Sequence, residues 1–379
     1  MSTAAAGVTG MAWCTALGDD IDEVWQALLA GRTGLTEVPS AHELRSLRVG
    51  AVDRVDPELP PVERQRLMTV GALTRALADA SLAVDDPELL AVFGTSYGPH
   101  LDDPDTVSLS RWAVTAARDA GLVRAPLVIS TACSAGSDTV AVALELLRSG
   151  SASRCVCVGV DVLTPAKRLG HSLLGTMSAS DLRAFDSRHD GTLLGEGAGV
   201  LVVETVAAAR ARGVGLLALV AGAGASNDAT GSAVPDPSGR ALELAVDRAL
   251  RSAGRQRDEV SLINAHGSGT PANDVLESTA YSRLFAASEL PPTLFATKGS
   301  FGHTLGATGA IEAITVIQAL RTGWLPPVYE LCQPLPDLRL PVVTAAAAAP
   351  VGLGLSVTLG FGGFNTCLAL AKAPADDAR

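Results

Sequence analysis

The chain has 379 residues, of which 47% are hydrophobic, so it can build a large buried core in one to three domains. Its formal net charge of −11 argues against nucleic acid as a partner, because chains that neutralise phosphates usually carry a basic excess. No apolar run approaches the roughly 18 residues of a membrane span, and the start "MSTAAAGVTGMAW" lacks the basic region and cleavage site of a secretion signal. We therefore expect a cytoplasmic protein that does not bind a membrane.

Short apolar segments alternate with helical stretches along the chain, which predicts an α/β fold. The predicted strands cover residues 89–94, 126–130, 155–163, 199–204 and 216–225. Segments 143–150 and 316–323 each end a long apolar helix with arginine in its last turn and glycine after it. This echo suggests a gene duplication that divides the chain into halves 1–210 and 211–379.

A lone cysteine stands in the stretch "STACSAG" (130–136), directly after a predicted strand. The residues after Cys133 place Val140, Leu144 and Leu147 on one face of a helix, so the thiol begins that helix. Unpaired N–H groups and the helix dipole favour a thiolate at such a position, which is the nucleophilic form of cysteine. From this segment alone, a buried and inert cysteine at a tight turn explains the pattern equally well.

Two of the six histidines fall in turns rich in glycine, serine and threonine. His266 lies in "INAHGSGTPANDVLES" (263–278), where we expect it to be exposed at a strand end, and His303 follows Lys298 in "TKGSFGHTLGATGAIEA" (297–313). Loop positions of this kind favour a chemical role over a core role. The other histidines have no comparable setting and are expected in structural or surface roles: His42, His100, His171 and His189.

These segments resemble the β-ketoacyl synthase family of the thiolase-like superfamily over nearly the whole chain. The resemblance is carried in order by "TACSAG", "RAFDSRHDGTLLGEGAGVLVVE" (183–204), "HGSGTPANDVLE", "KGSFGHTLGATGAIE" and "LGFGGFNTCLAL" (359–370). The motif style is most similar to stand-alone type II ketosynthases of polyketide or fatty-acid synthesis. The resemblance implies two duplicated α/β halves in a five-layer αβαβα arrangement, with Cys133 on the N-terminal half and both catalytic histidines on the C-terminal half.

The same resemblance implies an acyltransferase that loads an acyl group from acyl carrier protein onto Cys133 and condenses it with malonyl-carrier protein. The two histidines would stabilise the enolate, and the N–H groups of Cys133 and Phe361 would form an oxyanion hole. Phe361 would also gate the acyl pocket. The remaining implied roles are ordering of the site by Lys298, its support by Glu312, and phosphopantetheine binding by Ser268 and Thr270.

No resident cofactor is expected, because phosphopantetheine arrives on the carrier and no glycine-rich nucleotide turn occurs in a βαβ setting. No metal is expected either, because the cysteines and histidines lack ligand spacings. Arg64 and Arg66 in "PPVERQRL" (61–68) are candidates for docking the acidic carrier. The family also implies a dimer, either of identical chains or with a ketosynthase-like chain-length-factor subunit.

The chain departs from the family pattern in a short segment before the nucleophile (99–132) and in "TLL" after Gly191, where an aromatic residue is usual. Segment 99–132 usually shapes the acyl pocket and the dimer contact, so the chain length and the identity of the partner subunit stay open. The "TLL" change and "RAFD" (183–186), which replaces a form with proline, remove no catalytic group, and the intact Cys133 argues against a catalytically inactive chain-length factor. Four alternatives remain open: a serine hydrolase built on "GTSYG" (94–98), a thiolase using Cys367, a scaffold that only binds, and a non-elongating acyltransferase on the same fold.

Overall fold

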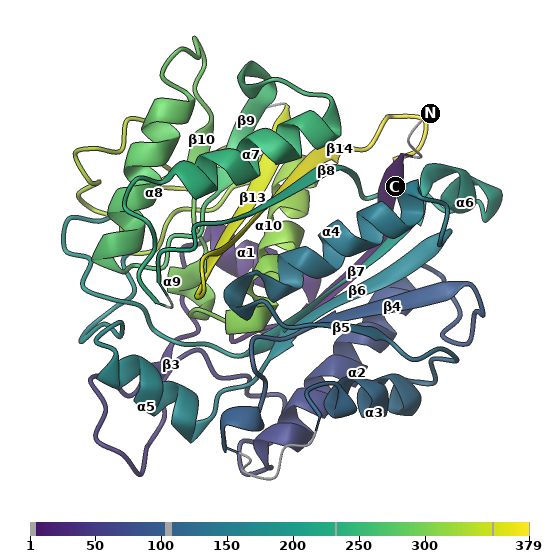
Figure 1. Ribbon diagram of the computed structural model, residues 1–379, viewed down its shortest axis with the longest axis horizontal. Helices are drawn as coiled ribbons and strands as arrows, with labels where there is room; N and C mark the ends of the chain where they lie inside the picture. Colours follow the sequence, from purple (N-terminus) through teal and green to yellow (C-terminus); the bar gives the residue numbers. More distant parts are fainter. Residues whose placement is uncertain (1–4, 103–107, 232, 351, 379) are drawn as a thin grey trace.

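The structure is a computed structural model that describes residues 5–102, 108–231, 233–350 and 352–378 (Figure 1). Ten strands form one mixed sheet, in the spatial order β10-β9-β13-β14-β8-β1-β7-β6-β4-β5. The first half supplies β1 (Ala6–Cys14), β4 (Leu89–Gly94), β5 (Leu127–Ile129), β6 (Arg154–Asp161) and β7 (Gly197–Thr205). The second half supplies β8 (Ala218–Asn227), β9 (Val260–Asn264), β10 (Thr293–Phe295), β13 (Leu353–Gly360) and β14 (Phe364–Lys372).

The two halves have the same topology. When the five strands of each half are numbered in chain order, their spatial order is 3-2-4-5-1 in both, with the same parallel and antiparallel pairings. Strands β1 and β8 pair antiparallel over three residue pairs, so the two five-stranded sheets join edge to edge. The predicted duplication of an α/β unit is therefore confirmed.

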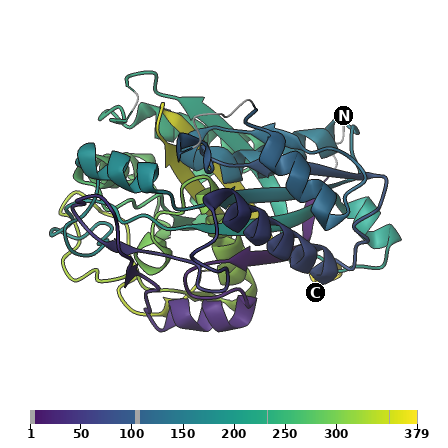
Figure 2. The ribbon, with the colours of Figure 1, turned by 90° about the horizontal axis from the view of Figure 1, so that it is seen from below.

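Helices form the other layers of the molecule. Helices α2 (Pro61–Asp79) and α3 (Arg111–Ala120) cover the outer face of the first sheet and lie nearest the viewer in Figure 2. Helices α7 (Arg240–Ala253) and α8 (Pro271–Leu284) lie outside the second sheet. Helices α4 (Ala135–Arg148) and α10 (Thr308–Thr322) pack against each other and against strands of both halves, which gives the five-layer arrangement.

Shorter elements connect these layers. The helices are α1 (Ile21–Leu29), α5 (Pro165–Leu173), α6 (Val206–Ala211) and α9 (Lys298–Phe301). The 3-10 turns are η1 (His100–Asp102), η2 (Ala132–Ser134), η3 (Arg257–Glu259) and η4 (Leu305–Ala307). Two small sheets pair β2 (Thr36–Glu37) with β3 (Arg48–Val49) and β11 (Trp324–Leu325) with β12 (Ala347–Ala348).

Glycines allow the two central helices to touch. A Cβ on Gly309 of α10 would lie 2.4 Å from the backbone nitrogen of Ser137 in α4, and a Cβ on Gly136 would lie 2.7 Å from the backbone nitrogen of Ala310. Backbone atoms cannot retreat from such a contact, so only glycine permits this approach. The close packing brings the N-termini of α4 and α10 together, where the chain places its cysteine and its second histidine.

The five predicted strands all form, each within a few residues of the predicted limits. Cys155 and Cys157 are buried on one face of β6, while Val156 and Val158 pack into a separate core on the other face, as their alternation predicts. Among the described segments, no helix is both long and apolar enough to cross a membrane.

Candidate active site

Cys133 lies in the strained turn between β5 and α4. The preceding residue, Ala132, has a φ of 51°, a left-handed conformation that residues with a side chain adopt infrequently. The Asp138 carboxylate holds this turn, because it accepts hydrogen bonds from the hydroxyls of Thr131 at 2.5 Å and Ser134 at 2.9 Å. The turn points the thiol toward the second half of the chain, where only 5% of Cys133 is exposed.

Burial dominates the ionisation of this thiol. It raises the pKa of Cys133 to about 11, although a hydrogen bond from the Phe361 N–H and the charge of Lys298 both act to lower it. The expectation that the helix start would yield a thiolate is therefore wrong for the free protein, because loss of hydration outweighs the favourable groups. The nucleophile rests mainly as a thiol at neutral pH.

The two predicted histidines meet next to each other. Their ring centroids are 5.2 Å apart and the rings are edge to face at 79°. Both are buried, with 4% exposed, so the expectation of an exposed His266 is wrong. Burial, followed by the charge of Lys298, holds the pKa of both imidazoles well below its usual range. Both rings are therefore neutral at pH 7.

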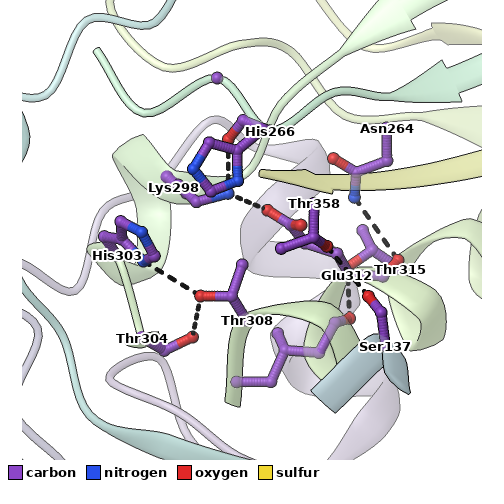
Figure 3. A network of polar contacts seen from close by, with 12 residues as sticks. Ser137, Asn264, His266, Lys298, His303, Thr304, Thr308, Glu312, Thr315 and Thr358 are labelled. Carbon is purple, nitrogen blue, oxygen red and sulfur yellow. Dashed lines mark hydrogen bonds and ion pairs between the residues drawn. The ribbon is translucent and has the colours of Figure 1, made fainter. Parts of the chain in front are cut away.

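The surroundings of His303 determine which of its nitrogens carries the proton. The backbone N–H of Leu305 donates to Nδ1 at 3.1 Å, and the Thr308 hydroxyl lies 3.1 Å from the same nitrogen (Figure 3). Since Nδ1 accepts, the single proton of the neutral ring resides on Nε2. His303 is thereby prepared as a hydrogen-bond donor.

Lys298 and Glu312 form a buried ion pair behind His266. The Lys298 ammonium donates to the backbone oxygen of His266 and to Glu312 Oε1, and both side chains are only 2% exposed (Figure 3). Burial raises the pKa of Glu312 to about 7, while Lys298 opposes the rise. The lysine thus contacts the histidine loop, as its predicted ordering role requires.

Glu277 is a supporting residue to which the sequence interpretation gave no role. Its carboxylate accepts the backbone N–H groups of His266 at 2.8 Å and Gly267 at 2.7 Å, the Asn273 amide at 2.7 Å and the Tyr281 hydroxyl at 3.0 Å. Burial raises its pKa to about 7. The sequence contains a signal for this supporting role, because residues 273, 277 and 281 follow the four-residue spacing of one helix face directly after His266.

The thiol and both imidazoles line one cavity of 340 Å³, whereas Lys298, Glu312 and Glu277 are not among its lining residues. The predicted residues that line it are Cys133, His266, Ser268, Thr270, His303 and Phe361. The hydroxyls of Ser268 and Thr270 are 2.9 Å apart. Thr192 lies in the same wall, and its buried hydroxyl has no hydrogen-bond partner among the described residues. The cavity therefore combines a thiol, two neutral imidazoles and several hydroxyls that are able to bind a substrate.

Sequence comparison matches the N-terminal domain of β-ketoacyl synthases at residues 6–110 and 113–209, and the C-terminal domain at residues 217–331. The chain belongs to the β-ketoacyl synthase family. It is 30% identical to a 3-oxoacyl-acyl-carrier-protein synthase 2 of Synechocystis, over 96% of this chain and 97% of that protein. The corresponding protein of Mycobacterium leprae is 31% identical, over 96% and 95% of the two chains.

Solved ketosynthase structures have the same fold. The ishigamide ketosynthase/chain length factor matches with a TM-score of 0.91 and 27% identity, over 98% of this chain and 100% of that one. A type II PKS acyl-carrier protein in complex with its ketosynthase bound to the hexaketide matches with a TM-score of 0.90 and 24% identity, over 98% and 100% of the two chains. The thiolase-like fold that the motifs implied is therefore confirmed.

His171 of this ketosynthase-family chain also lines the cavity, so it is not a surface residue, and the expected structural role stays a prediction. Its ring stacks on Phe361 with centroids 5.5 Å apart and an interplanar angle of 18°, and its Nδ1 lies 2.9 Å from the Thr176 hydroxyl. Burial lowers the pKa of His171 to about 4. Only the tertiary structure brings α5 to the "GFGGF" loop, and no local sequence signal marks this contact.

Arg64 cannot dock a carrier, which corrects the prediction for this residue. It is 6% exposed, its guanidinium donates to the backbone oxygens of Val55 and Asp56 at 2.7 Å each, and it forms an ion pair with Glu196. The charge of Arg64 is already paired inside the protein, because α2 packs the face that carries this residue against the sheet. Arg66 is partly exposed and pairs with Glu63 and Asp119.

Two of the alternative sites lack the partners that they need. Ser96 of "GTSYG" bonds to Asp161 rather than to a histidine. Cys367 lies inside β14, where burial raises the pKa of its thiol. In the described part of the chain, no group of three or more histidine, cysteine or acidic residues is arranged to hold a metal ion.

Proposed function

We propose that the chain is a β-ketoacyl-acyl-carrier-protein synthase that performs decarboxylative Claisen condensation on Cys133. The observation that carries this proposal is the convergence of the thiol with two neutral histidines in one cavity. A neutral imidazole carries one N–H, which can donate a hydrogen bond to the oxygen of a developing enolate. Family membership supports the same reaction class.

The first step transfers the acyl group. The sulfur of Cys133 attacks the thioester carbonyl of the acyl-carrier protein, and the N–H groups of Cys133 and Phe361 bind the oxyanion. The carbon–sulfur bond to the phosphopantetheine arm then breaks. The thiol proton of Cys133 ends on the departing pantetheine sulfur, so no outside base is consumed. Lys298 lowers the cost of the transient thiolate, because its charge acts to lower the pKa of this thiol.

The second step forms the carbon–carbon bond. The carbon–carbon bond to the malonyl carboxylate breaks, carbon dioxide leaves, and the electron pair forms an enolate whose oxygen accepts hydrogen bonds from His266 and His303. The enolate carbon attacks the acyl carbonyl on Cys133. The carbon–sulfur bond to Cys133 breaks, and the β-ketoacyl product remains on the carrier. The departing thiolate of Cys133 then takes one proton from water, which balances the reaction.

The carrier brings the only prosthetic group that this reaction needs. Ser268, Thr270 and Thr192 offer hydroxyls along the cavity wall to the amides of the phosphopantetheine arm. Arg66 is the remaining candidate for docking the acidic carrier, with part of its side chain exposed at the start of α2. We propose type II polyketide or specialised fatty-acid synthesis as the setting, in the cytoplasm.

We also propose that the first half pairs with a second ketosynthase-like subunit, either identical or of the chain-length-factor kind. Strand β5 is an edge of the sheet, and apolar side chains on it and before it in the chain are exposed: Leu127 at 48%, Val123 at 64% and Leu109 at 44%. An exposed apolar edge strand is normally covered in a stable protein. A solved relative is itself a ketosynthase/chain length factor.

A non-elongating acyltransferase is not favoured, because transfer to an amine or alcohol forms no enolate that the paired histidine donors could stabilise.

The deciding experiment incubates the protein with acyl-carrier thioesters and malonyl-carrier. Intact mass spectrometry then follows the acyl adduct on Cys133 and the product. Loss of carbon dioxide with a two-carbon gain is expected, whereas acyl loading without chain extension would refute condensation.

A further inference from the structure

Asp161, at the C-terminal end of β6, is a fully buried carboxylate for which the proposed reaction has no direct use. Its Oδ2 accepts the backbone N–H groups of Ser96 and Gly306, each at 2.9 Å, and its Oδ1 accepts the ammonium of Lys167. Asp161 is 0% exposed and Lys167 is 4% exposed. A buried carboxylate that gathers backbone donors from distant segments fixes those segments relative to one another.

One of those donors belongs to the turn that orients the second histidine. Gly306 follows Leu305, whose own N–H donates to His303 Nδ1 at 3.1 Å. Leu305 has a φ of 51°, so this turn is strained and needs outside support. The carboxylate of Asp161 supplies that support one residue away from the bond that sets the His303 tautomer.

The backbone at Gly306 packs closely against the residues that follow β4. A Cβ on Gly306 would lie 2.2 Å from the Ser96 nitrogen, so the His303 turn presses directly on the end of β4, and Asp161 binds the N–H groups on both sides of the contact. Asp161 comes from the first half and His303 from the second. The carboxylate therefore aligns the histidine with the half that carries Cys133.

We propose that Asp161 is a positioning residue for His303, holding Nδ1 as an acceptor so that Nε2–H points to the enolate oxygen. The inference rests on the proposed condensation for its kinetic consequence, but its structural part concerns the imidazole tautomer alone. Lys167 forms a buried ion pair with this carboxylate, and loss of either partner would leave the other buried group without its partner.

The test variant is Asp161→Asn, with Asp161→Asn/Lys167→Met as a second variant that leaves no unpaired ammonium. Glu204→Gln is the matched control, because Glu204 is also a 0% exposed carboxylate paired with a cation, Arg212, but it lies at the far end of β7. We expect malonyl decarboxylation to fall about tenfold or more in kcat with KM nearly unchanged, because a small misplacement of a reacting group is costly. Acylation of Cys133 should change less than about threefold. In the control variant, the ratio of the decarboxylation rate to the acylation rate should equal that of the wild type.

Nitrogen NMR of the His303 ring reports which nitrogen carries the proton. A loss of general stability would leave this tautomer unchanged, so the measurement separates positioning from a purely structural role. In the wild-type protein Nδ1 should show the shift of an unprotonated nitrogen, the Gly306 amide should exchange slowly, and Asp161→Asn should shift the ring toward a mixture of tautomers. Equal losses of both half-reactions, or a His303 spectrum that is unchanged in the variant, would overturn the inference. If neither variant folds, a protonated Nδ1 or a rapidly exchanging Gly306 amide in the wild type would overturn it. A wild type that decarboxylates nothing would instead reject the proposed function, and the spectra would still test the tautomer.

Discussion

The geometry of His303 predicts that two similar substitutions will have different effects. The amide of Asn lies near the position of Nδ1, whereas the amide of Gln reaches the position of Nε2. In the structure, Nδ1 only accepts from Leu305 N–H at 3.1 Å, so the catalytic donor is Nε2–H. His303→Gln should retain a donor toward the enolate, and His303→Asn should lose it.

The magnitude follows from the loss of one donor to a developing oxyanion, which typically costs about 10²–10³ in rate, or roughly 3–4 kcal/mol. We expect His303→Asn to decarboxylate malonyl-carrier at least about a hundredfold more slowly than wild type. His303→Gln should be about tenfold faster than His303→Asn, since its donor is present but less well oriented. Acylation of Cys133 should stay within about threefold in both variants, because the histidine does not activate the thiol.

The assay measures single-turnover acylation and malonyl decarboxylation separately for each variant, with folding checked by thermal melting. Because burial holds the pKa of His303 well below its usual range, its ring stays neutral, so the ratio of the wild-type to the variant decarboxylation rate should be flat between about pH 6 and 8. The ratio is the quantity to measure, because Glu312 and Glu277, whose pKa values are about 7, titrate in the wild type and in both variants. Equal rates for the two variants would refute the assigned tautomer. Acylation that falls first and recovers as the pH rises would show that the histidine is a general base for the thiol.

Three further predictions concern the nucleophile and the carrier. Cys133→Ala should abolish acyl loading in intact-mass spectra while the fold persists, whereas Cys133→Gln should keep or raise carbon dioxide release from malonyl-carrier, because its amide mimics the acyl carbonyl; an undiminished adduct in the alanine variant would remove Cys133 from its role. Burial raises the pKa of Cys133 to about 11, so alkylation by iodoacetamide should keep rising about tenfold per pH unit through pH 9, and a plateau by pH 8 would contradict this ionisation. Arg66→Glu should raise the KM for malonyl-carrier several-fold with little change in kcat, compared with Arg257→Glu, which alters an exposed ion pair on another helix; an unchanged KM would exclude Arg66 from docking.

The sequence alone determined the features that depend on neighbouring residues. Short apolar runs located the strands, and small residues around Cys133 predicted a tight turn at a helix start. The motifs containing His266 and His303 identified both loops and, through the family resemblance, the fold. These features are local because backbone conformation and side-chain spacing are set within a few residues.

Only the tertiary structure decided which polar groups are buried and what they contact. Arg64 and Arg66 are two residues apart and equally basic, but they lie on opposite sides of helix α2. Arg64 faces the sheet and is buried, whereas Arg66 faces outward and is partly exposed. The thiol pKa of Cys133 is set by burial beneath the second half, which overrides the helix start. Asp161 appears in the sequence as one acid in an apolar strand, and its contact with Gly306 joins residues 145 positions apart. Hydration and charge pairing depend on such distant contacts, and the periodicity of a sequence does not encode them.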